Sequence, residues 1–401
     1  MPPPARPLPD DLIPDILVRL ASDDPAGIIR AAAVCKAWRR ILADPAFAAR
    51  YCALHPSPPV LGFLHRPPDL QIAQFVPTPT TSFRPSPSAV QRSRHPLDCR
   101  HGRALFYDYG SLDSFIVWDP ITAAVHKIPP VPDVFTQPAV LCAAGAGCDD
   151  HHRGCGGGKP FIVAFAGVEN IPEDYCFDAH ACYWASDTGE WSVHINIHLD
   201  HGRYRLTDRP AALVGDALYF VGKSGFLLRY RYGLLRRVGR RSILSAGIRE
   251  ADVLSVIEPP QGKRLGTVFV MAAEGGGLGL ASMNKNSSRL YLWAREAVAA
   301  GIAGDDGRWV QRRIIDLNKL LPGGNPGSRP CLSGVGEDGS VIFVSTDDGV
   351  FTVELESSKV KKVCSEMGKV DLVLPFMSFY THSLLLKLAS GNLASAPAEN
   401  Q

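Results

Sequence analysis

A strand, turn and strand unit recurs from about residue 97 almost to the end of the chain, and this repetition limits the folds that the sequence can adopt. Each copy joins an aromatic or aliphatic strand to a polar turn and a second strand. The copies are SFIVWDPITAAVHKIPP, ACYWASDTGEWSVHI, ALYFVGKSGFLLRYRY, RLYLWAREA leading to RWVQRRIIDL, and VIFVSTDDGVFTVELESSKVKKV. Each copy is interpreted as the outer hairpin of a four-stranded sheet.

Repeated four-stranded sheets favour a β-propeller. The copies are unevenly spaced, roughly 35 to 75 residues apart, which indicates insertions within a degenerate repeat. At roughly 45 to 50 residues per sheet, this part of the chain supplies about six or seven blades. A pair of β-sandwiches is the main alternative, but a repeated hairpin favours the propeller. We therefore predict a mainly β protein with a small α module at its N-terminus.

The N-terminal module is predicted over residues 8–55, where helix signals replace strand signals. The first helix begins at Asp10 or Asp11, either of which can cap free backbone N–H groups, and runs to Leu20. Pro14 falls within the first turn, where the N–H that proline lacks has no partner within the helix.

Two further proline pairs mark later helix starts. Asp24-Pro25 predicts a second short helix, AAAVCKAWRRIL a third, and Asp44-Pro45 a last turn toward Tyr51. A module of this size is near the lower limit for independent folding, roughly 40 to 60 residues. Its apolar faces therefore need a partner or the rest of the chain.

The remaining boundaries follow from composition. Residues 56–96 are rich in proline, serine and threonine, which predicts surface loops with strands at Val60–Leu64 and Gln71–Val76 rather than a sustained proline-rich ligand. Residues 97–388 form the predicted propeller-like, target-binding domain. The two ends, residues 1–7 and 389–401, are predicted to be disordered.

Composition narrows the classes of partner and compartment. A formal net charge of +2 with 20% charged residues argues against a global field that attracts nucleic acid or anionic membrane. No uninterrupted apolar run reaches the roughly 18 residues of a membrane span. The start lacks the apolar core of a secretion signal, and the 10 cysteines form no dense framework, so free thiols are expected. These features predict a cytoplasmic or nuclear protein.

The N-terminal stretch resembles the F-box. LPDDLIPDILVRLASDDPAGIIRAAAVCKAWRRILADPAF, from Leu8 to about Tyr51, has the LP opening, the IL-x-RL helix and the VCK-x-W-RR helix in the expected order. The rest is similar to the propeller-type, kelch-like domain of a large plant group of F-box proteins. The phrases that carry this similarity are LGFLH, VWDPIT, LGLASMNKNSSRLYLWARE, VQRRIIDL, EDGSVIFVSTDDGVFTVEL and PFMSFYT.

This resemblance implies a protein partner. F-box modules dock on a Skp-type adaptor, which joins them to a cullin and a RING subunit, while the second domain binds a target protein for ubiquitination. It implies a receptor with no catalytic residues and no cofactor. The residues that match adaptor-facing positions are Leu8, Pro9, Ile16, Leu17, Leu20, Val34, Cys35, Trp38 and Leu42. Pro14 departs from the pattern, since a larger aliphatic residue is common there.

Two motifs could indicate other chemistry. Gly334, Gly336 and Gly339 have G-x-G-x-x-G spacing, but a strand follows where a dinucleotide site needs a helix, which predicts a tight β-turn. A loop places five potential zinc ligands close together, but their spacing matches no common structural zinc site, so a solvated loop is favoured and no metal is predicted. These residues are Cys142, Cys148, His151, His152 and Cys155.

A basic segment, LRYRYGLLRRVGRR, holds six arginines between Arg229 and Arg241. Strand alternation would place Arg229 and Arg231 on one face and the tyrosines on the other, as on a half-buried blade edge. A docking or nuclear-import patch and an RNA contact are the alternatives. The candidate target-docking residues are Arg229, Arg231, Arg236 and Arg237.

Three functions remain open. The favoured one is a substrate receptor of a ubiquitin ligase; the others are an adaptor-bound scaffold that degrades no target, and a propeller that binds a small ligand or acts as an enzyme. The sequence contains no nucleophile elbow before a helix and no HExxH helix. Target contacts are expected on loops of one rim, with residues 170–180 and 283–289 as candidates.

Overall fold

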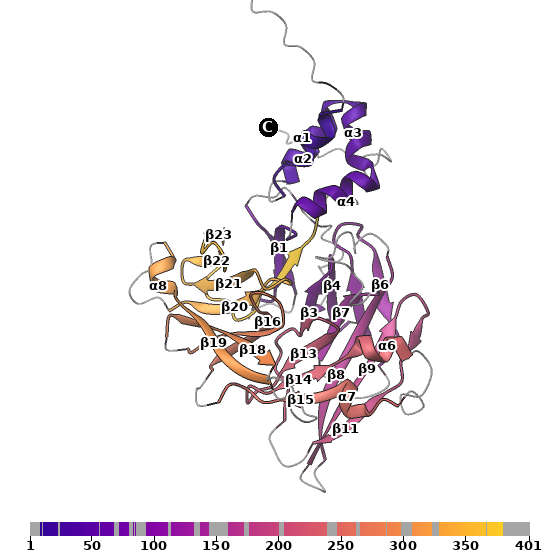
Figure 1. Ribbon diagram of the computed structural model, residues 1–401, viewed down its shortest axis with the longest axis vertical. Helices are drawn as coiled ribbons and strands as arrows, with labels where there is room; N and C mark the ends of the chain where they lie inside the picture. Colours follow the sequence, from indigo (N-terminus) through magenta and orange to yellow (C-terminus); the bar gives the residue numbers. More distant parts are fainter. Residues whose placement is uncertain are drawn as a thin grey trace, which may run out of the picture.

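The computed structural model shows an N-terminal helical module standing on a ring of β-sheets (Figure 1). The described residues are 9, 11–22, 25–55, 57–67, 72–79, 83, 85, 94–110, 114–131, 137–143, 159–171, 176–199, 204–238, 247–261, 265–285, 287–297, 307–322, 329–365 and 367–379. Among them, no helix combines the length and apolar character needed to cross a membrane.

The ring consists of six antiparallel sheets, which confirms the propeller and fixes its blade number. Blade 1 contains β1 (Val60–His65), β2 (Gln74–Pro77) and β24 (Leu374–Met377). Blade 2 contains β3 (Arg94–Arg100), β4 (Arg103–Asp108), β5 (Ser114–Trp118) and β6 (Val125–Ile128). Blade 3 contains β7 (Gln137–Cys142), β8 (Phe161–Ile171), β9 (Cys176–Ala185) and β10 (Glu190–Trp191), and β11 (Ile195–Leu199) also pairs with β9.

The other three blades each have four strands. Blade 4 contains β12 (Ala212–Val214), β13 (Ala217–Val221), β14 (Leu227–Tyr230) and β15 (Leu254–Ile257). Blade 5 contains β16 (Thr267–Ala272), β17 (Leu278–Met283), β18 (Arg289–Ala297) and β19 (Gly307–Asp316). Blade 6 contains β20 (Cys331–Val335), β21 (Val341–Thr346), β22 (Gly349–Glu354) and β23 (Val360–Cys364).

One strand of each blade lies toward the centre of the ring: β24 in blade 1, and the first strand along the chain in each of the other five blades. β24 contacts β3, β3 contacts β7, β12 contacts β16, β16 contacts β20, and β20 contacts β24. The carboxyl ends of these strands meet at one end of the ring. His101 after β3 contacts both Glu337 after β20 and Cys142 at the end of β7. A Cβ on Gly336 would lie 3.2 Å from Met377 Sδ, so the end of β24 lies there too.

The ring closes through strands from opposite parts of the chain. In blade 1, Gly62 of β1 pairs with Phe376 of β24, and Leu64 pairs with Leu374. The inner strand β24 thus comes from the C-terminal region, and β1 and β2 come from the segment after the helical module. Closure of this kind removes a pair of exposed sheet edges.

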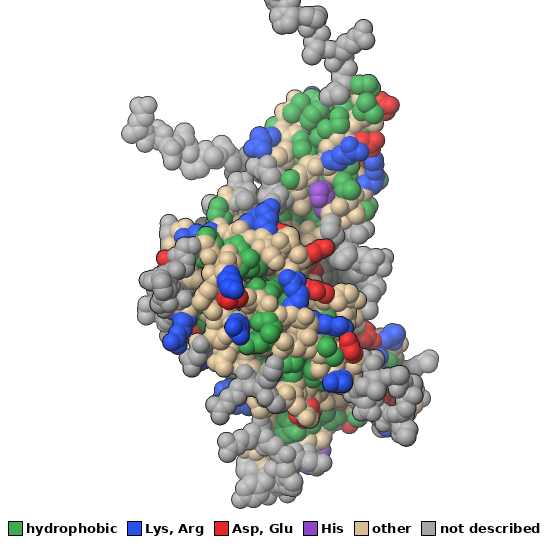
Figure 2. Space-filling model, turned by 60° about the vertical axis from the view of Figure 1, so that its left-hand side comes forward, with side chains coloured by type: hydrophobic (Ala, Val, Ile, Leu, Met, Phe, Trp, Pro, Cys, Tyr) green, Lys and Arg blue, Asp and Glu red, His purple; other side chains and the backbone are tan. Residues whose placement is uncertain are grey.

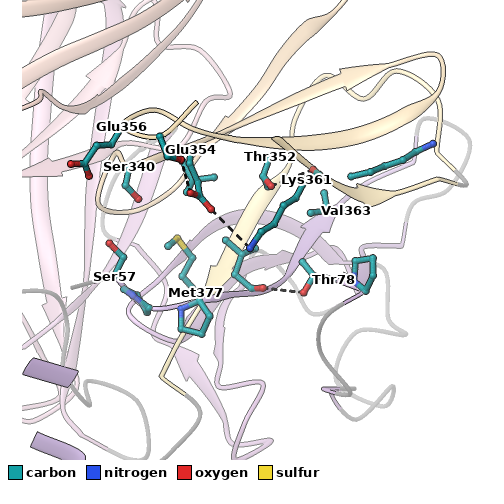
Figure 3. Close-up of a pocket in the computed structure, with 16 residues that line it drawn as sticks. Ser57, Thr78, Ser340, Thr352, Glu354, Glu356, Lys361, Val363 and Met377 are labelled. Atoms are coloured by element: carbon teal, nitrogen blue, oxygen red, sulfur yellow. Dashed lines mark hydrogen bonds and ion pairs between the residues drawn. The ribbon is translucent and has the colours of Figure 1, made fainter. Parts of the chain in front are cut away.

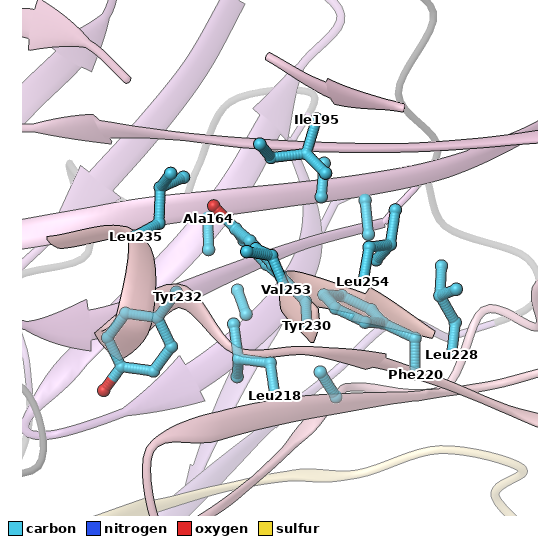
Figure 4. Packing of buried hydrophobic residues seen from close by; sticks show 14 of the residues in the cluster. Ala164, Ile195, Leu218, Phe220, Leu228, Tyr230, Tyr232, Leu235, Val253 and Leu254 are labelled. Atoms are coloured by element: carbon cyan, nitrogen blue, oxygen red, sulfur yellow. The ribbon is translucent and has the colours of Figure 1, made fainter. Parts of the chain in front are cut away.

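The seam between blades 3 and 4 holds a large hydrophobic core. Figure 4 shows side chains of β8, β11, β13, β14 and the helix α6 (Tyr232–Val238) gathered in one space. Tyr230 and Tyr232 are fully buried, whereas Arg229 and Arg231 are half-buried, so the predicted alternation of the basic segment is correct. The strand ends at Tyr230, however, and α6 begins at Tyr232.

One predicted hairpin occupies a different place in its blade. ALYFVGKSGFLLRYRY forms β13 and β14, the second and third strands of blade 4, and not an outer hairpin. The outer strand β15 is reached only after α6 and the short helix α7 (Glu250–Val253). A further short helix, α8 (Leu317–Leu320), follows β19.

The N-terminal module contains four helices: α1 (Ile13–Leu17), α2 (Pro25–Val34), α3 (Lys36–Ala43) and α4 (Pro45–Leu54). The predicted start of the third helix, at AAAV, was wrong, because these residues belong to α2, which runs through Val34. Cys35 then adopts an extended conformation, and its Sγ accepts the backbone N–H of Trp38 at 3.5 Å. Asp44 caps α4 through the N–H of Ala46 as predicted, but α4 is a full helix and not a single turn.

Helix α1 is shorter than predicted. It begins at Ile13 and ends at Leu17, and the residue at its cap position, Leu12, makes no side-chain capping bond. Pro14 does lie in the first turn, so it does not break the helix. The predicted cap Asp24, in the pair Asp24-Pro25, lies outside the described residues, as do the predicted tails 1–7 and 389–401.

Candidate functional site

The helical module folds around its own small core. Leu17 and Leu42 are each only 1% exposed and pack in one cluster with Phe47 and Tyr51. The Tyr51 hydroxyl donates to the carbonyl of Leu20 at 3.1 Å, which ties α4 to the turn after α1. Leu17 and Leu42, expected on the adaptor-facing surface, therefore contribute to internal packing in the free protein.

A different set of apolar side chains faces solvent. Ile16 is 44% exposed and Val34 is 61% exposed, although both are large and hydrophobic. Leu12, which was not among the expected docking residues, is 46% exposed one helical turn before Ile16. Figure 2 shows hydrophobic side chains gathered on this module, in the upper part of the view.

The remaining expected docking residues fall into three groups. Pro9 and Cys35 are exposed, Leu20 and Trp38 are half-buried, and Leu8 lies outside the described residues. We call Pro9, Leu12, Ile16, Val34 and Cys35 the exposed module face. The i, i+4 spacing of Leu12 and Ile16 was the sequence signal for the residue that was missed.

The module is anchored to the closing strand of the propeller. Phe379, just after β24, packs against the hydrophobic core of the module. His55 caps the end of α4 and lies with its Nε2 3.2 Å from the carbonyl oxygen of Val18. These contacts fix α1 and α4 to the same end of the ring, where β24 terminates.

A cleft of about 760 Å³ opens between blades 1 and 6, beside the segment that leaves the module (Figure 3). Its walls include Val60, Val363 and Met377 on the apolar side. At its charged side, Lys361 Nζ lies 4.0 Å from Glu354 Oε1. The cleft thus combines an apolar surface with an ion pair and faces the helical module.

A buried charged network joins the inner strands of several blades. Asp98 Oδ2 accepts the N–H of Val140 at 2.9 Å, and Arg100 Nη2 lies 3.4 Å from Asp98 Oδ1. The same guanidinium donates to the carbonyl of Ala211 in the segment leading into β12. Because these contacts satisfy charges inside a packed ring, we interpret the network as structural.

Glu337 extends this network to blade 6. Its Oε1 accepts the backbone N–H of His101 at 2.8 Å, and its Oε2 is shielded from solvent although the residue as a whole is half-buried. Burial of the carboxyl group raises the pKa of Glu337 to about 8. Burial also raises the pKa of Asp98. The buried carboxyl group of Glu337 therefore keeps its proton at pH values where an exposed carboxyl group is ionised.

The glycine motif forms a turn, as predicted. The N–H of Gly339 donates to the carbonyl of Gly336 at 3.0 Å, between β20 and β21. Gly339 has a φ of +73°, which favours glycine. The motif therefore serves a hairpin, with no helix to receive a phosphate.

The candidate metal-binding loop lies mostly outside the described residues. Of its potential ligands, only Cys142 is described; it ends β7, is buried, and its N–H donates to His101 Nδ1 at 2.7 Å. The prediction concerning Cys148, His151, His152 and Cys155 stays a prediction. Within the described part of the chain, no three ligand-type residues are grouped as a metal site.

The structure separates the basic segment into two environments. Arg229 Nε donates to Ser255 Oγ at 3.0 Å on the face of blade 4. Arg231 and Arg237 both approach Asp216 Oδ2, at 3.5 and 2.8 Å. Asp216 therefore partly neutralises these two arginines. Arg236, the fourth candidate docking residue, is half-buried on α6.

Comparisons with known proteins identify the N-terminal helical module. The family model described as F-box-like matches residues 6–53. Among curated proteins, the Putative F-box protein At3g16210 of Arabidopsis thaliana is 26% identical over 217 residues. The match covers 53% of this chain and 53% of that protein, so the chain spans about half the length of this relative.

Two solved structures align with most of the chain at low identity. The periplasmic gluconolactonase PpgL of Pseudomonas aeruginosa is 13% identical, with a TM-score of 0.39 and coverage of 77% of this chain and 84% of that one. TolB from Acinetobacter baumannii is 12% identical, with a TM-score of 0.44 and coverage of 84% and 72%. These scores are low, so the blade assignment rests on the strand order. The chain therefore carries an F-box-like domain at its N-terminus, followed by a six-bladed β-propeller.

Proposed function

We propose that this chain is the substrate-recognition subunit of a Skp-cullin-F-box ubiquitin ligase. The observation that carries the proposal is the exposed module face, in which large apolar residues such as Ile16 and Val34 remain uncovered within an F-box-like domain. Large apolar side chains left exposed in this way are typical of protein interaction sites. In this proposal a Skp-type adaptor covers them, and the cullin and RING subunits are recruited through that adaptor.

The propeller then holds a target protein. Catalysis belongs to other subunits, and this chain raises the effective concentration of a target lysine beside the charged conjugating enzyme. No chemical group of this chain takes part in the transfer. The contact of Phe379 with the module core supports this role, because a fixed module orientation keeps the bound target at a defined position. We propose the cytoplasm or the nucleus as the site of action.

Adaptor capture tests the first step. The double variant Ile16→Asp and Val34→Asp places two charges on the exposed module face without removing core side chains. We expect the full chain to bind a purified Skp-type adaptor in a pull-down and the double variant to lose at least about tenfold in affinity. Leu17→Asp is unsuitable, because Leu17 is buried and its loss would unfold the module.

A matched control comes from the propeller. Ile314 is 50% exposed on β19, so Ile314→Asp adds the same kind of charge at a similarly exposed isoleucine. This control should bind the adaptor like the unchanged chain. Equal binding by the control and by the double variant, with both folded, would remove the basis of the proposal.

The same double variant separates a ligase from a scaffold. Proteins that the propeller captures in cells should accumulate and lose ubiquitin when the double variant replaces the unchanged chain. Captured proteins whose ubiquitination is the same with either version would favour a scaffold.

A further inference from the structure

The outer strand of blade 5 forms the longest strand edge of the propeller. β19 has 10 residues, whereas the outer strands of the other five blades have two to five. Figure 1 shows β19 on the outside of its blade, and in the described part of the chain no strand pairs with its far side. An open edge presents a row of backbone N–H and C=O groups to another strand. We call the far side of β19 the blade 5 edge.

The direction of the backbone groups along this edge follows from one hydrogen bond. The N–H of Leu317, directly after β19, donates to the carbonyl of Ser288 at 2.9 Å. The bonding direction alternates from residue to residue along a strand, so the N–H and C=O of Ile314 point away from β18. The Ile314 side chain is also 50% exposed. The blade 5 edge therefore presents both backbone groups and an apolar side chain.

The features that usually prevent strand addition are few on β19. The strand contains no proline and no lysine, and its one irregularity is a bulge at Arg312. Its three arginines disfavour pairing with a second copy of β19, because like charges on neighbouring strands destabilise a sheet. The same charges favour a strand of opposite charge.

One face of the edge is apolar and lies toward blade 4. Trp309 Nε1 donates to the carbonyl of Glu258, just after β15, at 2.8 Å. Ile314 lies on the same face, because its cross-strand partner Tyr291 packs in the same hydrophobic cluster as Trp309. Alternate side chains of an added strand would lie beside this face.

The other face is basic and lies toward blade 6. Arg313 Nη1 donates to the carbonyl of Leu355, just after β22, at 2.7 Å. Arg308 lies on the same face as Arg313, because their partners on β18, Glu296 and Leu292, are four residues apart. The remaining side chains of an added strand would lie beside these arginines.

Carboxylates offset only part of this charge. Arg312 contacts Glu296, and Arg313 Nη1 lies 2.7 Å from Glu274 Oε1, while Arg308 is exposed. Ion pairs as exposed as these are weak and exchange readily. Together β18 and β19 contain five arginines against one glutamate and one aspartate, a formal charge of +3, whereas the whole chain carries +2. The edge is therefore complementary to an acidic strand.

We propose that the blade 5 edge binds an extended segment of the target protein in which acidic and apolar residues alternate. The inference rests on the proposed function and names the chemical class of the target segment. The segment adds a strand to blade 5, and its backbone bonds to β19 supply affinity. Its acidic side chains lie beside Arg308 and Arg312, and its apolar side chains lie beside Ile314.

Direct binding of short peptides to the full chain tests this inference. The probe is a fluorescein-labelled peptide of Glu-Val repeats with glycine-serine ends, measured by fluorescence polarisation at physiological salt. One comparison peptide has the same composition with its glutamates and valines in separate blocks, and the other has Lys-Val repeats. We expect the alternating acidic peptide to bind at least about tenfold more tightly than either.

Two variants separate the backbone contribution from the charge contribution. Ile314→Pro removes an outward N–H without removing a bond to β18, and it should weaken binding at least about tenfold, whereas Ile314→Val should not. The double variant Arg308→Gln and Arg312→Gln should also weaken binding at least about tenfold. Its control is Lys127→Gln with Lys285→Gln, which removes the same charge from exposed positions in blades 2 and 5 outside β18 and β19.

Hydrogen exchange locates the bound peptide. The amides of β19 should exchange more slowly when the alternating peptide is present, whereas those of the outer strand β23 in blade 6 should not change. Thermal unfolding of each variant shows that a loss of binding does not come from a loss of folding. The arginine variant keeps the backbone of β19 intact, so the test does not depend on the proline variant alone.

Several results would overturn the inference. They are equal binding of the alternating and block peptides, absence of binding, equal losses with the arginine and lysine variants, and unchanged exchange of β19 in the presence of peptide. Slow exchange of β19 only in a dimer of the chain would identify a second copy as the occupant instead. Adaptor capture by the exposed module face is measured separately. A negative peptide result with intact adaptor capture would therefore reject the blade 5 edge and leave the proposed function in place.

Discussion

The ring of Phe379 packs edge-on against the ring of Tyr51, with centroids 6.4 Å apart and ring planes at 87°. Tyr51 is a fully buried core residue of the helical module, and Phe379 follows the inner strand that closes the propeller. The two domains therefore share one piece of hydrophobic core. Edge-on aromatic pairs of this kind contribute about 0.5 to 1.5 kcal/mol beyond area burial.

Removing this shared contact should destabilise the module. We expect Phe379→Ala to lower the unfolding free energy of the module by about 2 kcal/mol, less than for a fully buried phenylalanine, because Phe379 is only half-buried. Hydrogen exchange of the amides in α1 and α4 should accelerate, while that of blades 3 and 4 should not change. Phe379→Leu, which keeps an apolar side chain, is the control and should lose less. Unchanged exchange in α4 would contradict a shared core.

Truncation of Leu42 and of Val34 should have different effects on the stability of the module. Leu42→Ala removes a buried side chain and is expected to cost about 2 to 5 kcal/mol of stability. Val34→Ala truncates an exposed side chain and should change stability by less than about 0.5 kcal/mol. Urea unfolding followed by helical circular dichroism would show both. Similar costs for the two variants would mean that the exposed module face is in fact packed.

Glu337 should make stability depend on pH. Its pKa is about 8 in the folded chain and near 4.5 when exposed, so the folded state binds more protons between these values. Stability from this group is therefore full below about pH 4.5 and falls as the pH rises toward 8. The slope from one proton is at most about 1.4 kcal/mol per pH unit.

Glu337→Gln isolates this effect. The amide oxygen can still accept the N–H of His101, but the side chain no longer titrates. Thermal unfolding between pH 5 and 8 should show a flatter pH profile for the variant and a higher relative stability at the alkaline end. Parallel profiles for the two proteins would show that Glu337 ionises normally.

The turn at Gly339 should be sensitive to a single added carbon. Gly339 has a φ of +73°, and a Cβ there would lie 2.7 Å from the carbonyl oxygen of Ala272 in blade 5. Gly189→Ala is the control, because Gly189 has a φ of +69° and an added Cβ would meet no atom within 4 Å. We expect about 1 to 2 kcal/mol lost for the control and clearly more for Gly339→Ala. Equal changes in melting temperature would argue against close packing of this turn on blade 5.

Sequence patterns were sufficient for the architecture, because they reflect local chemistry. The period of two that buries Tyr230 while leaving Arg229 half-exposed is visible in the letters. The turn at Gly339 and the cap at Asp44 are likewise local. Blade number was less accessible, since the closing strand joins Leu64 to Leu374 and no local pattern records such a pairing.

Helical periodicity alone could not predict which apolar residues of the module are exposed. Leu17 and Ile16 are neighbours in one predicted apolar stripe, yet only Ile16 faces solvent. Which of the two side chains is covered depends on how α3 and α4 pack against α1. The break between α2 and α3 occurs at Cys35, and the sequence pattern did not predict the extended backbone of that residue. The pocket between blades 4 and 5 combines Arg209 and Lys223 from separate strand connections with the start of β16, so its formation requires both blades.

The pairing of β1 with β24 also determines when the ring can close during protein synthesis. β1 leaves the ribosome soon after the module, but its inner partner appears only after the other five blades have been made. Until then β1 keeps an open edge, and the module lacks Phe379. A ribosome that stalls before β24 would release a chain with an unsealed ring and a loosened F-box-like module, so incomplete copies should be ready substrates for chaperones.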